Sequence, residues 1–283
     1  MFARKLSFTA LALVLVAIAG LARADDATRG SWTISQSEQA GKVMFALMQN
    51  RPRHRWNSES DWPLTAFTGL DVSPARHDVK FAVIRDAGRF DCSGYLEAGE
   101  GAGTFQFTAN PDFVRDMAAI GFTDIDAEKQ MAMAVHDVSV AFAREMKAQK
   151  LSRFDTDKLI AFRIFDVDSR FIRELRAEGL AANDADKLVA FRVHGVTPEI
   201  VRDLRKAGLQ LTEDQLIAFR VHGVSPEFVS KVEELGYENP NPDQLVSMKI
   251  FGVTPEFITG LRARGLKDLT IDKLVQLKVH GID

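Results

Sequence analysis

The stretch that decides the fold is His194-Gly195-Val196-Thr197-Pro198-Glu199, which returns in closely similar form at 222–227 and at 251–256. These copies define a repeat of 29 residues, with one repeat of 28. In this register the C-terminal part of the chain divides into six full repeats and a stub at 280–283. The repeats begin at Phe107, His136, Phe165, His194, His222 and Phe251. A period of this length is typical of helical-repeat proteins.

Each repeat carries the start and stop signals of two short helices. In the repeat that begins at His194, the hydroxyl of Thr197 can cap a first helix and Pro198 suits its first turn. Gly208 stands where a left-handed residue ends that helix. A second helix begins at a capping box that joins Thr212 and Gln215. The expected apolar positions of the first and second helices are Phe113, Phe142, Phe171, Ile200, Phe228 and Phe257, and Leu159, Leu188, Leu216, Leu245 and Leu274.

One repeat departs from this pattern. Lys150 stands where the other repeats carry glycine, and we expect the first helix of that repeat to end differently. Helices this short are marginal on their own, so neighbouring repeats must bury one another's apolar faces. The sequence therefore predicts an α-solenoid of about six two-helix repeats over residues 107–283.

Residues 25–106 have a different pattern, with apolar alternation and turn residues that predict a small antiparallel β-sheet or sandwich. The expected strands are Ser31–Gln36, Lys42–Met48, Val79–Arg85, Arg89–Leu96 and Gly103–Phe107. The polar segment from Asn50 to Asp78, which is interrupted by three prolines, is expected to be a long loop. The predicted fold class is thus α+β, with a β module followed by a helical repeat domain.

The N-terminus reads as a signal peptide over residues 1–24. Arg4 and Lys5 precede an apolar run from Leu6 to Leu21, and Ala22-Arg23-Ala24 is a small-residue cleavage site. The run is short for a permanent membrane span, so we expect cleavage after Ala24; an uncleaved anchor is the alternative. No later stretch is apolar enough to span. The predicted location is outside the cytoplasm, which means the periplasm in a Gram-negative bacterium.

Composition and net charge exclude several classes of protein and of partner. Apolar residues make up 46% and charged residues 27%, which excludes disordered, collagen-like and multi-span membrane proteins. The formal net charge is −3, and it falls to −6 without residues 1–24 because 33 basic residues then face 39 acidic ones. We expect no nucleic-acid partner. Cys92 is the single cysteine, so no internal disulfide forms, and a buried unreactive thiol is expected.

A histidine column occupies the first position of several repeats. Its members are His136, His194, His222 and His280. A shared metal ion would need ligands about 2 Å away, whereas equivalent residues of stacked repeats lie about 10 Å apart. Phenylalanine also takes this position at 165 and 251. The pattern favours helix termination, in which an imidazole bonds a last carbonyl, over metal binding.

A basic ladder runs two residues before the histidine column. It consists of Arg163, Arg192, Arg220, Lys249 and Lys278. An acidic ladder six residues earlier in each second helix consists of Asp157, Asp186, Asp214, Asp243 and Asp272. If the basic side chains share one face, they form a candidate interaction surface for carboxylates, phosphates or an acidic partner segment. The pattern favours a structural role as ion pairs between repeats and as helix-terminal charges, because acids at helix starts and bases at helix ends complement the helix dipole.

Other clusters carry weaker signals. A basic and aromatic cluster could hold an anionic polymer, but its position favours a solvated loop. The cluster consists of Arg51, Arg53, His54, Arg55 and Trp56. Gly99 to Gly103 predicts a hairpin turn and lacks the residues of a phosphate-binding loop.

Trp32 and Trp62 suit the core of the β module better than a sugar platform. We find no metal, nucleophile-elbow or Cys-x-x-Cys motif, so the sequence predicts no cofactor and no enzymatic activity.

The repeat pattern His-Gly-Val-Thr-Pro-Glu, together with the module that ends in Gly103-Thr104-Phe105-Gln106-Phe107, resembles the repeat-bearing extracytoplasmic regions attached to Bla/Mec-type bacterial sensor membrane metallopeptidases. That resemblance covers nearly all of the chain after residue 24. It implies a role in sensing or protein interaction. The zinc motif and the membrane helices of that family's peptidase part are absent, so no catalytic residue carries over.

These patterns predict an exported, non-enzymatic interaction or scaffold protein of the bacterial cell envelope. The partner would be a protein or an envelope component. The alternative is an envelope sensor whose β module binds a small molecule or a sugar. An enzyme whose residues are scattered along the sequence is a third possibility.

Overall fold

The computed structural model describes residues 29–51 and 54–282, and it divides them into two compact units. The β unit contains the described residues up to Ala82 together with Phe90–Thr108. The helical unit contains Val83–Arg89 and the described residues from Ala109 onward. The predicted boundary at 106/107 thus lies two residues before the observed one. The predicted signal peptide lies outside the described residues.

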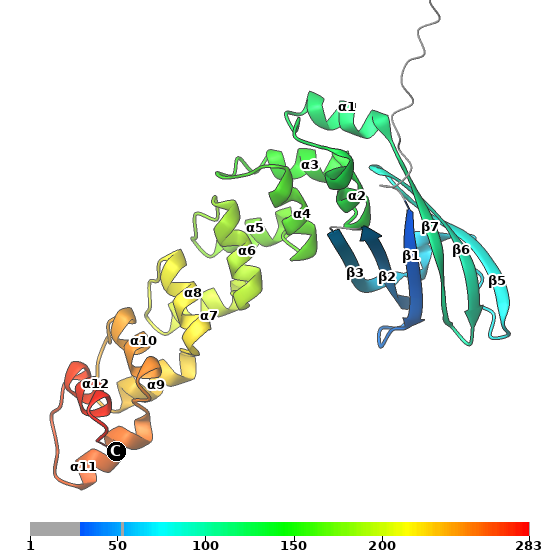
Figure 1. The fold of residues 1–283 in the computed structure, drawn as a ribbon. Coiled ribbons are helices and arrows are strands. Elements are labelled where there is room, and N and C mark those ends of the chain that lie inside the picture. The colour runs from blue at the N-terminus through cyan, green and yellow to red at the C-terminus, as the bar shows by residue number, and fades with distance from the viewer. Residues whose placement is uncertain (1–28, 52–53, 283) are drawn as a thin grey trace, which may run out of the picture. The chain divides into compact units, whose positions relative to one another are not determined.

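The β unit is one curled antiparallel sheet of seven strands (Figure 1). Its strands, in chain order, are β1 Arg29–Gln36, β2 Lys42–Arg51, β3 His54–Pro63, β4 Phe67–Thr68, β5 His77–Arg85, β6 Gly88–Glu97 and β7 Glu100–Ala109. Their order in the sheet is β3-β2-β1-β7-β6-β5-β4, so β1 pairs with both β2 and β7. The short 3-10 turn Leu64–Ala66 precedes β4.

Aromatic rings fill the core of this sheet. Trp32 is fully buried, and its indole N–H donates to the carbonyl of Thr104 at 3.1 Å. Its ring meets Phe81 edge to face, with centroids 5.1 Å apart. A Cβ at Gly94 or Gly103 would overlap both the opposing backbone and the Trp32 ring. Glycine at these two strand positions therefore lets the indole lie flat against β6 and β7.

The predicted loop over Asn50–Asp78 is wrong in its first half. Strand β3 follows β2 in a hairpin whose register joins Lys42 to Pro63 and Arg51 to His54. Only Trp56 and Trp62 give this strand an apolar signal, and Trp62 packs on the ring of Phe45 with centroids 5.3 Å apart. An edge strand takes its hydrogen bonds from one neighbour, so it forms without the apolar alternation that identifies a central strand.

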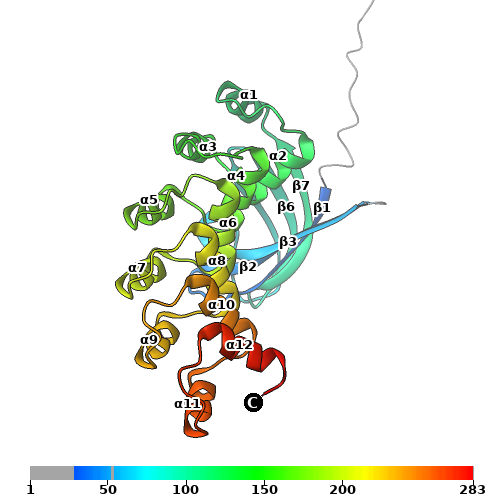
Figure 2. The same cartoon turned by 90° about the vertical axis from the view of Figure 1, so that its left-hand side faces the viewer.

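The helical unit has six consecutive helix pairs, as predicted. Its helices are α1 Pro111–Ala119, α2 Ala127–Val135, α3 Val140–Lys147, α4 Thr156–Ile164, α5 Ser169–Ala177, α6 Ala185–His194, α7 Pro198–Lys206, α8 Glu213–His222, α9 Pro226–Glu234, α10 Pro242–Ile250, α11 Pro255–Ala263 and α12 Ile271–Val279. Figure 2 shows the first and second helices of the repeats as two columns. Second helices contact second helices in α4/α6, α6/α8, α8/α10 and α10/α12.

Local capping explains where these helices begin. The hydroxyl of Thr197 accepts from the amide of Ile200, and Pro198 occupies the first turn of α7. Thr212 and Gln215 form the predicted capping box of α8. Gly208, at the end of the first helix, has the expected positive φ. These observations confirm the predicted helix start and stop signals.

Lys150 takes a glycine-like backbone conformation, but the first helix of its repeat ends differently, as expected. Its φ is 56°, in the left-handed region that glycine occupies in the other repeats, such as Gly179 with a φ of 80°. Helix α3 ends at Lys147, one residue earlier in the repeat than α5, which ends at Ala177. The lysine backbone bears the strain of the left-handed conformation. The predicted apolar columns are buried or half-buried throughout, and no described helix is long and apolar enough to cross a membrane.

Candidate interaction surface

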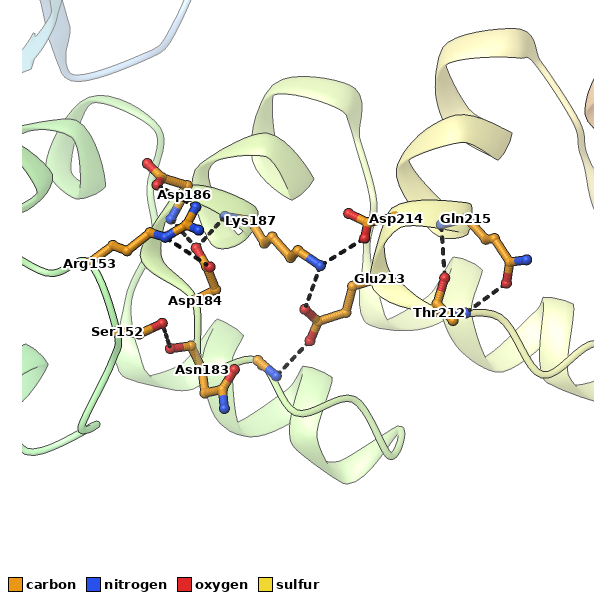
Figure 3. A network of polar contacts seen from close by, with 11 residues as sticks. Ser152, Arg153, Asn183, Asp184, Asp186, Lys187, Thr212, Glu213, Asp214 and Gln215 are labelled. Atoms are coloured by element: carbon orange, nitrogen blue, oxygen red, sulfur yellow. Dashed lines mark hydrogen bonds and ion pairs between the residues drawn. The ribbon is translucent and has the colours of Figure 1, made fainter. Parts of the chain in front are cut away.

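Three of the five members of the acidic ladder pair with lysines from the preceding repeat. Asp186 pairs with Lys158 at 2.6 Å, and Asp214 pairs with Lys187 at 3.1 Å. Lys187 also lies 3.8 Å from Glu213, whose carboxylate accepts the backbone N–H of Ala182 at 2.9 Å (Figure 3). The N-terminal ends of the second helices α2, α4, α6 and α8 are therefore joined by ion pairs.

These contacts perturb the groups involved. The pKa of the Asp186 carboxyl lies below its ordinary value, chiefly because Lys158 donates a hydrogen bond to it. The pKa of Lys158 is raised by the same bond. The lysines that pair with the acidic ladder stand at one repeat position that the sequence reasoning missed, although Lys129, Lys158 and Lys187 recur with the period of the repeat.

The predicted basic ladder lies at the other end of the second helices. Arg163 Nε donates to the carbonyl of His136 at 3.2 Å. Arg192 Nη2 donates to the carbonyl of Asp166 at 2.6 Å, and Arg220 Nε donates to the carbonyl of His194 at 3.3 Å. Each acceptor is at the C-terminal end of the preceding repeat's second helix. These three arginines thus supply donors to helix ends that would otherwise lack them.

The ladder side chains also cover aromatic rings of the first helices. The Arg192 guanidinium lies 3.8 Å from the centroid of Phe171. The ammonium of Lys249 lies 4.1 Å from the Phe228 centroid. The corresponding distances are 5.1 Å for Arg163 over Phe142 and 4.2 Å for Lys278 over Phe257. In the repeat that begins at His194, Ile200 stands where the other repeats carry this phenylalanine, so Arg220 has an aliphatic neighbour at that position. These contacts fit the structural role that we weighed against a binding groove.

A second basic ladder, which the sequence reasoning missed, serves the first helices in the same way. Lys147 donates to the carbonyl of Ile120 and Arg205 to that of Glu178. Arg176 Nη2 donates to Gln149 at 3.1 Å, and Arg262 Nη2 donates to Leu235 at 2.6 Å. The signal was available, because positions 147, 176 and 205 are spaced by the repeat period.

The histidine column lies at the ends of second helices, as predicted for helix termination, but its imidazoles do not make the predicted bonds. His136 and His280 are the C-terminal caps of α2 and α12, and His194 and His222 are the last residues of α6 and α8. Within the described residues no imidazole of this column bonds a carbonyl, and the carbonyls of His136 and His194 accept from arginines instead. Burial and the nearby charge of Arg163 lower the pKa of His136.

The most regular exposed feature is a row of branched aliphatic side chains, one at the end of each second helix from α4 to α12. This aliphatic row consists of Ile164 (48% exposed), Val193 (53%), Val221 (51%), Ile250 (52%) and Val279 (56%). The equivalent residue of the first repeat, Val135, is buried. The aliphatic row directly follows the basic ladder in the sequence and was not anticipated from it.

A second, half-buried aliphatic residue lies one helical turn before each member of the row. In α8 these positions are Ile217 and Val221, and Asp214 continues the same face. From α4 to α12, each second helix therefore presents an acidic N-terminal end and, at its C-terminal end, an exposed aliphatic side chain directly after a basic one. Phe165 and Phe251, which are 38% and 44% exposed, extend the apolar surface in two repeats.

The other predicted sites are placed as follows. Cys92 is buried, and burial raises the pKa of its thiol to about 12. Trp32 and Trp62 are 0% and 6% exposed, so both belong to the core of the β unit as predicted. Of the basic and aromatic cluster, Arg51 ends β2 and His54 to Trp56 begin β3, so the cluster is not in a long loop. Among the described residues no group of three or more histidine, cysteine or acidic side chains could hold a metal ion.

Comparison with family models, with curated proteins and with solved structures finds no match to this chain. The resemblance to the extracytoplasmic regions of sensor metallopeptidases therefore stays a prediction.

Proposed function

We propose that the chain is an exported, non-enzymatic interaction or scaffold protein of the bacterial cell envelope, and that it binds a protein partner on the exposed face of its second helices. The observation that carries the proposal is the aliphatic row, whose members are each about half exposed and recur once per repeat. Large contiguous apolar patches on soluble proteins mark interaction sites, because water disfavours them.

The polar contacts around the row support this assignment. The acidic ladder is engaged with lysines through Lys158–Asp186 and Lys187–Asp214, and the arginines of the basic ladder bond helix ends. These charged residues hold the repeats together and thereby keep the aliphatic row in register. A rigid, regularly spaced surface lowers the ordering cost of binding a long partner. No comparable observation favours the sensor alternative, since the rings of Trp32 and Trp62 are buried in the β unit.

Site-specific crosslinking tests the proposal. A photoreactive residue at Val193 or at Val221 should capture one defined envelope protein in cells, whereas the same residue at the exposed Arg202 of α7 should not. The captured protein, once purified, should bind the wild-type chain and lose affinity for the Val193→Asn/Val221→Asn variant.

Capture from every position, or binding that survives the double substitution, would contradict the proposal. N-terminal sequencing of the protein recovered from the envelope fraction tests export separately. A mature chain that begins at Asp25 is the expected result, and recovery of an intact N-terminus in the cytoplasm would oppose it.

A further inference from the structure

The spacing of the aliphatic row restricts what can lie on it. Neighbouring second helices from α4 to α12 are in contact, and packed helices are about 8–10 Å apart. The row therefore offers one branched aliphatic side chain about every 10 Å. A partner that contacts every repeat must present apolar side chains at the same interval on one face.

An extended chain in the polyproline II conformation meets this requirement. It has three residues per turn and rises about 3.1 Å per residue, so every third side chain returns to the same face after about 9.3 Å. A β-strand fails because its successive side chains alternate between two faces, and a third residue points away from the first. This interval lies within the range of about 8–10 Å expected between neighbouring second helices.

The width of the apolar surface also favours an extended chain. Along α8 it comprises Ile217 and Val221, which are one helical turn apart, or about 6 Å. An α-helix is about 10–12 Å across and would extend over the charged ends of the second helices. An occupant wider than this surface would bury the charge of Asp214, at the N-terminal end of α8, or of Arg220, which lies beside Val221.

Charge selects the chemistry of the occupant. Arg192, Arg220 and Lys249 have no carboxylate within ion-pair distance in the described residues, whereas Asp186 and Asp214 at the opposite end are paired with lysines. The Arg220 guanidinium bonds the carbonyl of His194, the residue directly after Val193. A cationic side chain thus lies beside the row between neighbouring repeats.

The surface should attract a negatively charged occupant most strongly beside Arg192 and Arg220. Lys249 shares a cavity of about 310 Å³ with Glu227 and Glu256, which offset part of its charge. Carboxylates of an occupant are therefore expected to lie along the edge formed by Arg192 and Arg220, where charge-assisted hydrogen bonds are available.

We infer that the partner segment is an extended, acidic polypeptide with a branched aliphatic side chain at every third residue, bound with one such residue per repeat. This inference rests on the proposed function, since it specifies what the same face binds.

Fluorescence anisotropy with the purified full-length chain tests the inference. The probe is a labelled peptide of five Val-Pro-Glu triplets, and two comparison peptides replace Glu by Lys or place the same residues at irregular spacing. We expect saturable binding of the first peptide and affinity at least about tenfold weaker for each comparison peptide. The Val193→Asn/Val221→Asn variant should bind about tenfold less tightly. Val72→Asn, at a 47% exposed position of the β unit, should bind as the wild type does.

Several results would overturn the inference. Equal binding of the irregular peptide would remove the spacing argument, and tighter binding of an amphipathic helical peptide would remove the extended conformation. Concentration-dependent dimerisation lost in the double variant would identify a second copy as the occupant. If crosslinking at Val221 captures a partner that binds in purified form while no extended peptide binds, this inference fails and the proposed function stands. If neither binds, both fail.

Discussion

Replacing Arg192 by methionine separates a structural role of the basic ladder from a binding role. Arg192 Nη2 donates to the carbonyl of Asp166 at 2.6 Å, and the guanidinium lies 3.8 Å from the Phe171 centroid. A charged hydrogen bond contributes about 1.5 kcal/mol and a partly exposed cation–π contact about 1 kcal/mol. The Nε atom is buried without a hydrogen-bond partner, which costs about 1 kcal/mol and is relieved by the substitution. The expected net loss in the free energy of unfolding is about 1.5 kcal/mol.

Methionine keeps the apolar stem of arginine, so the packing under the guanidinium is largely retained. Thermal unfolding followed by far-ultraviolet circular dichroism should show a decrease in Tm of about 3–6 °C for a helical unit of this size. Arg192→Lys keeps the charge and the ring contact but loses the planar donor. Its Tm should therefore lie between those of the wild type and Arg192→Met. Lys206→Met is the matched control, because Lys206 is 70% exposed and pairs only with Asp203 at 3.4 Å.

Two results would contradict a structural role for Arg192. If Arg192→Met and Lys206→Met unfold at the same temperature as the wild type, the hydrogen bond and the ring contact contribute nothing to stability. If binding of the acidic peptide is then lost in Arg192→Met alone, the basic ladder is a contact surface in its own right. The structure predicts loss of stability together with weaker binding of the acidic peptide, because Arg192 bonds a helix end and also lies on the edge where the carboxylates of an occupant are expected.

Three further predictions follow from local geometry. Lys150→Gly should raise the free energy of unfolding by about 1 kcal/mol in urea titration, because glycine relieves the left-handed strain at a φ of 56°; an unchanged midpoint would contradict this. Gly260→Ala should stabilise α11 by about 0.5–1 kcal/mol, since no atom lies within 4 Å of the added Cβ; destabilisation would show that the position is packed. Cys92, whose thiol has a pKa of about 12, should react with iodoacetamide at pH 8 only in denaturant, and rapid labelling of the native protein would show that the thiol is accessible.

The repeat architecture could be predicted because its determinants are local and recur. Thr197, Pro198 and Gly208 each act within a few residues of their own position, and their copies occur in the same register in other repeats. Pattern reasoning therefore located both helices of every repeat. The burial of Trp32 and Cys92 could be predicted for a similar reason, since their residue types and strand alternation already indicate a core.

Other features depend on contacts between distant segments. Strand β3 has almost no apolar signal of its own, and its register is set by β2. Strand β7 begins at Glu100, three residues before the predicted start at Gly103. There the glycines resemble a turn in sequence, but Gly103 makes room for Trp32 and Gly101 for the strand residues Tyr95 and Leu96. The donors to the helix ends were likewise missed, because Arg205 reaches a carbonyl 27 residues earlier in the chain.

The identity of the aliphatic row is not explained by folding alone. Val193, Val221 and their counterparts lie at the ends of second helices, where a β-branched residue forms helix less readily than lysine or glutamate and where an exposed apolar side chain costs solubility. Neighbouring positions in the same helices carry charged residues that form hydrogen bonds and ion pairs with adjacent repeats. Charged side chains are therefore compatible with this part of the fold. All five exposed members are nonetheless valine or isoleucine, as expected if the row contacts an apolar partner along its whole length.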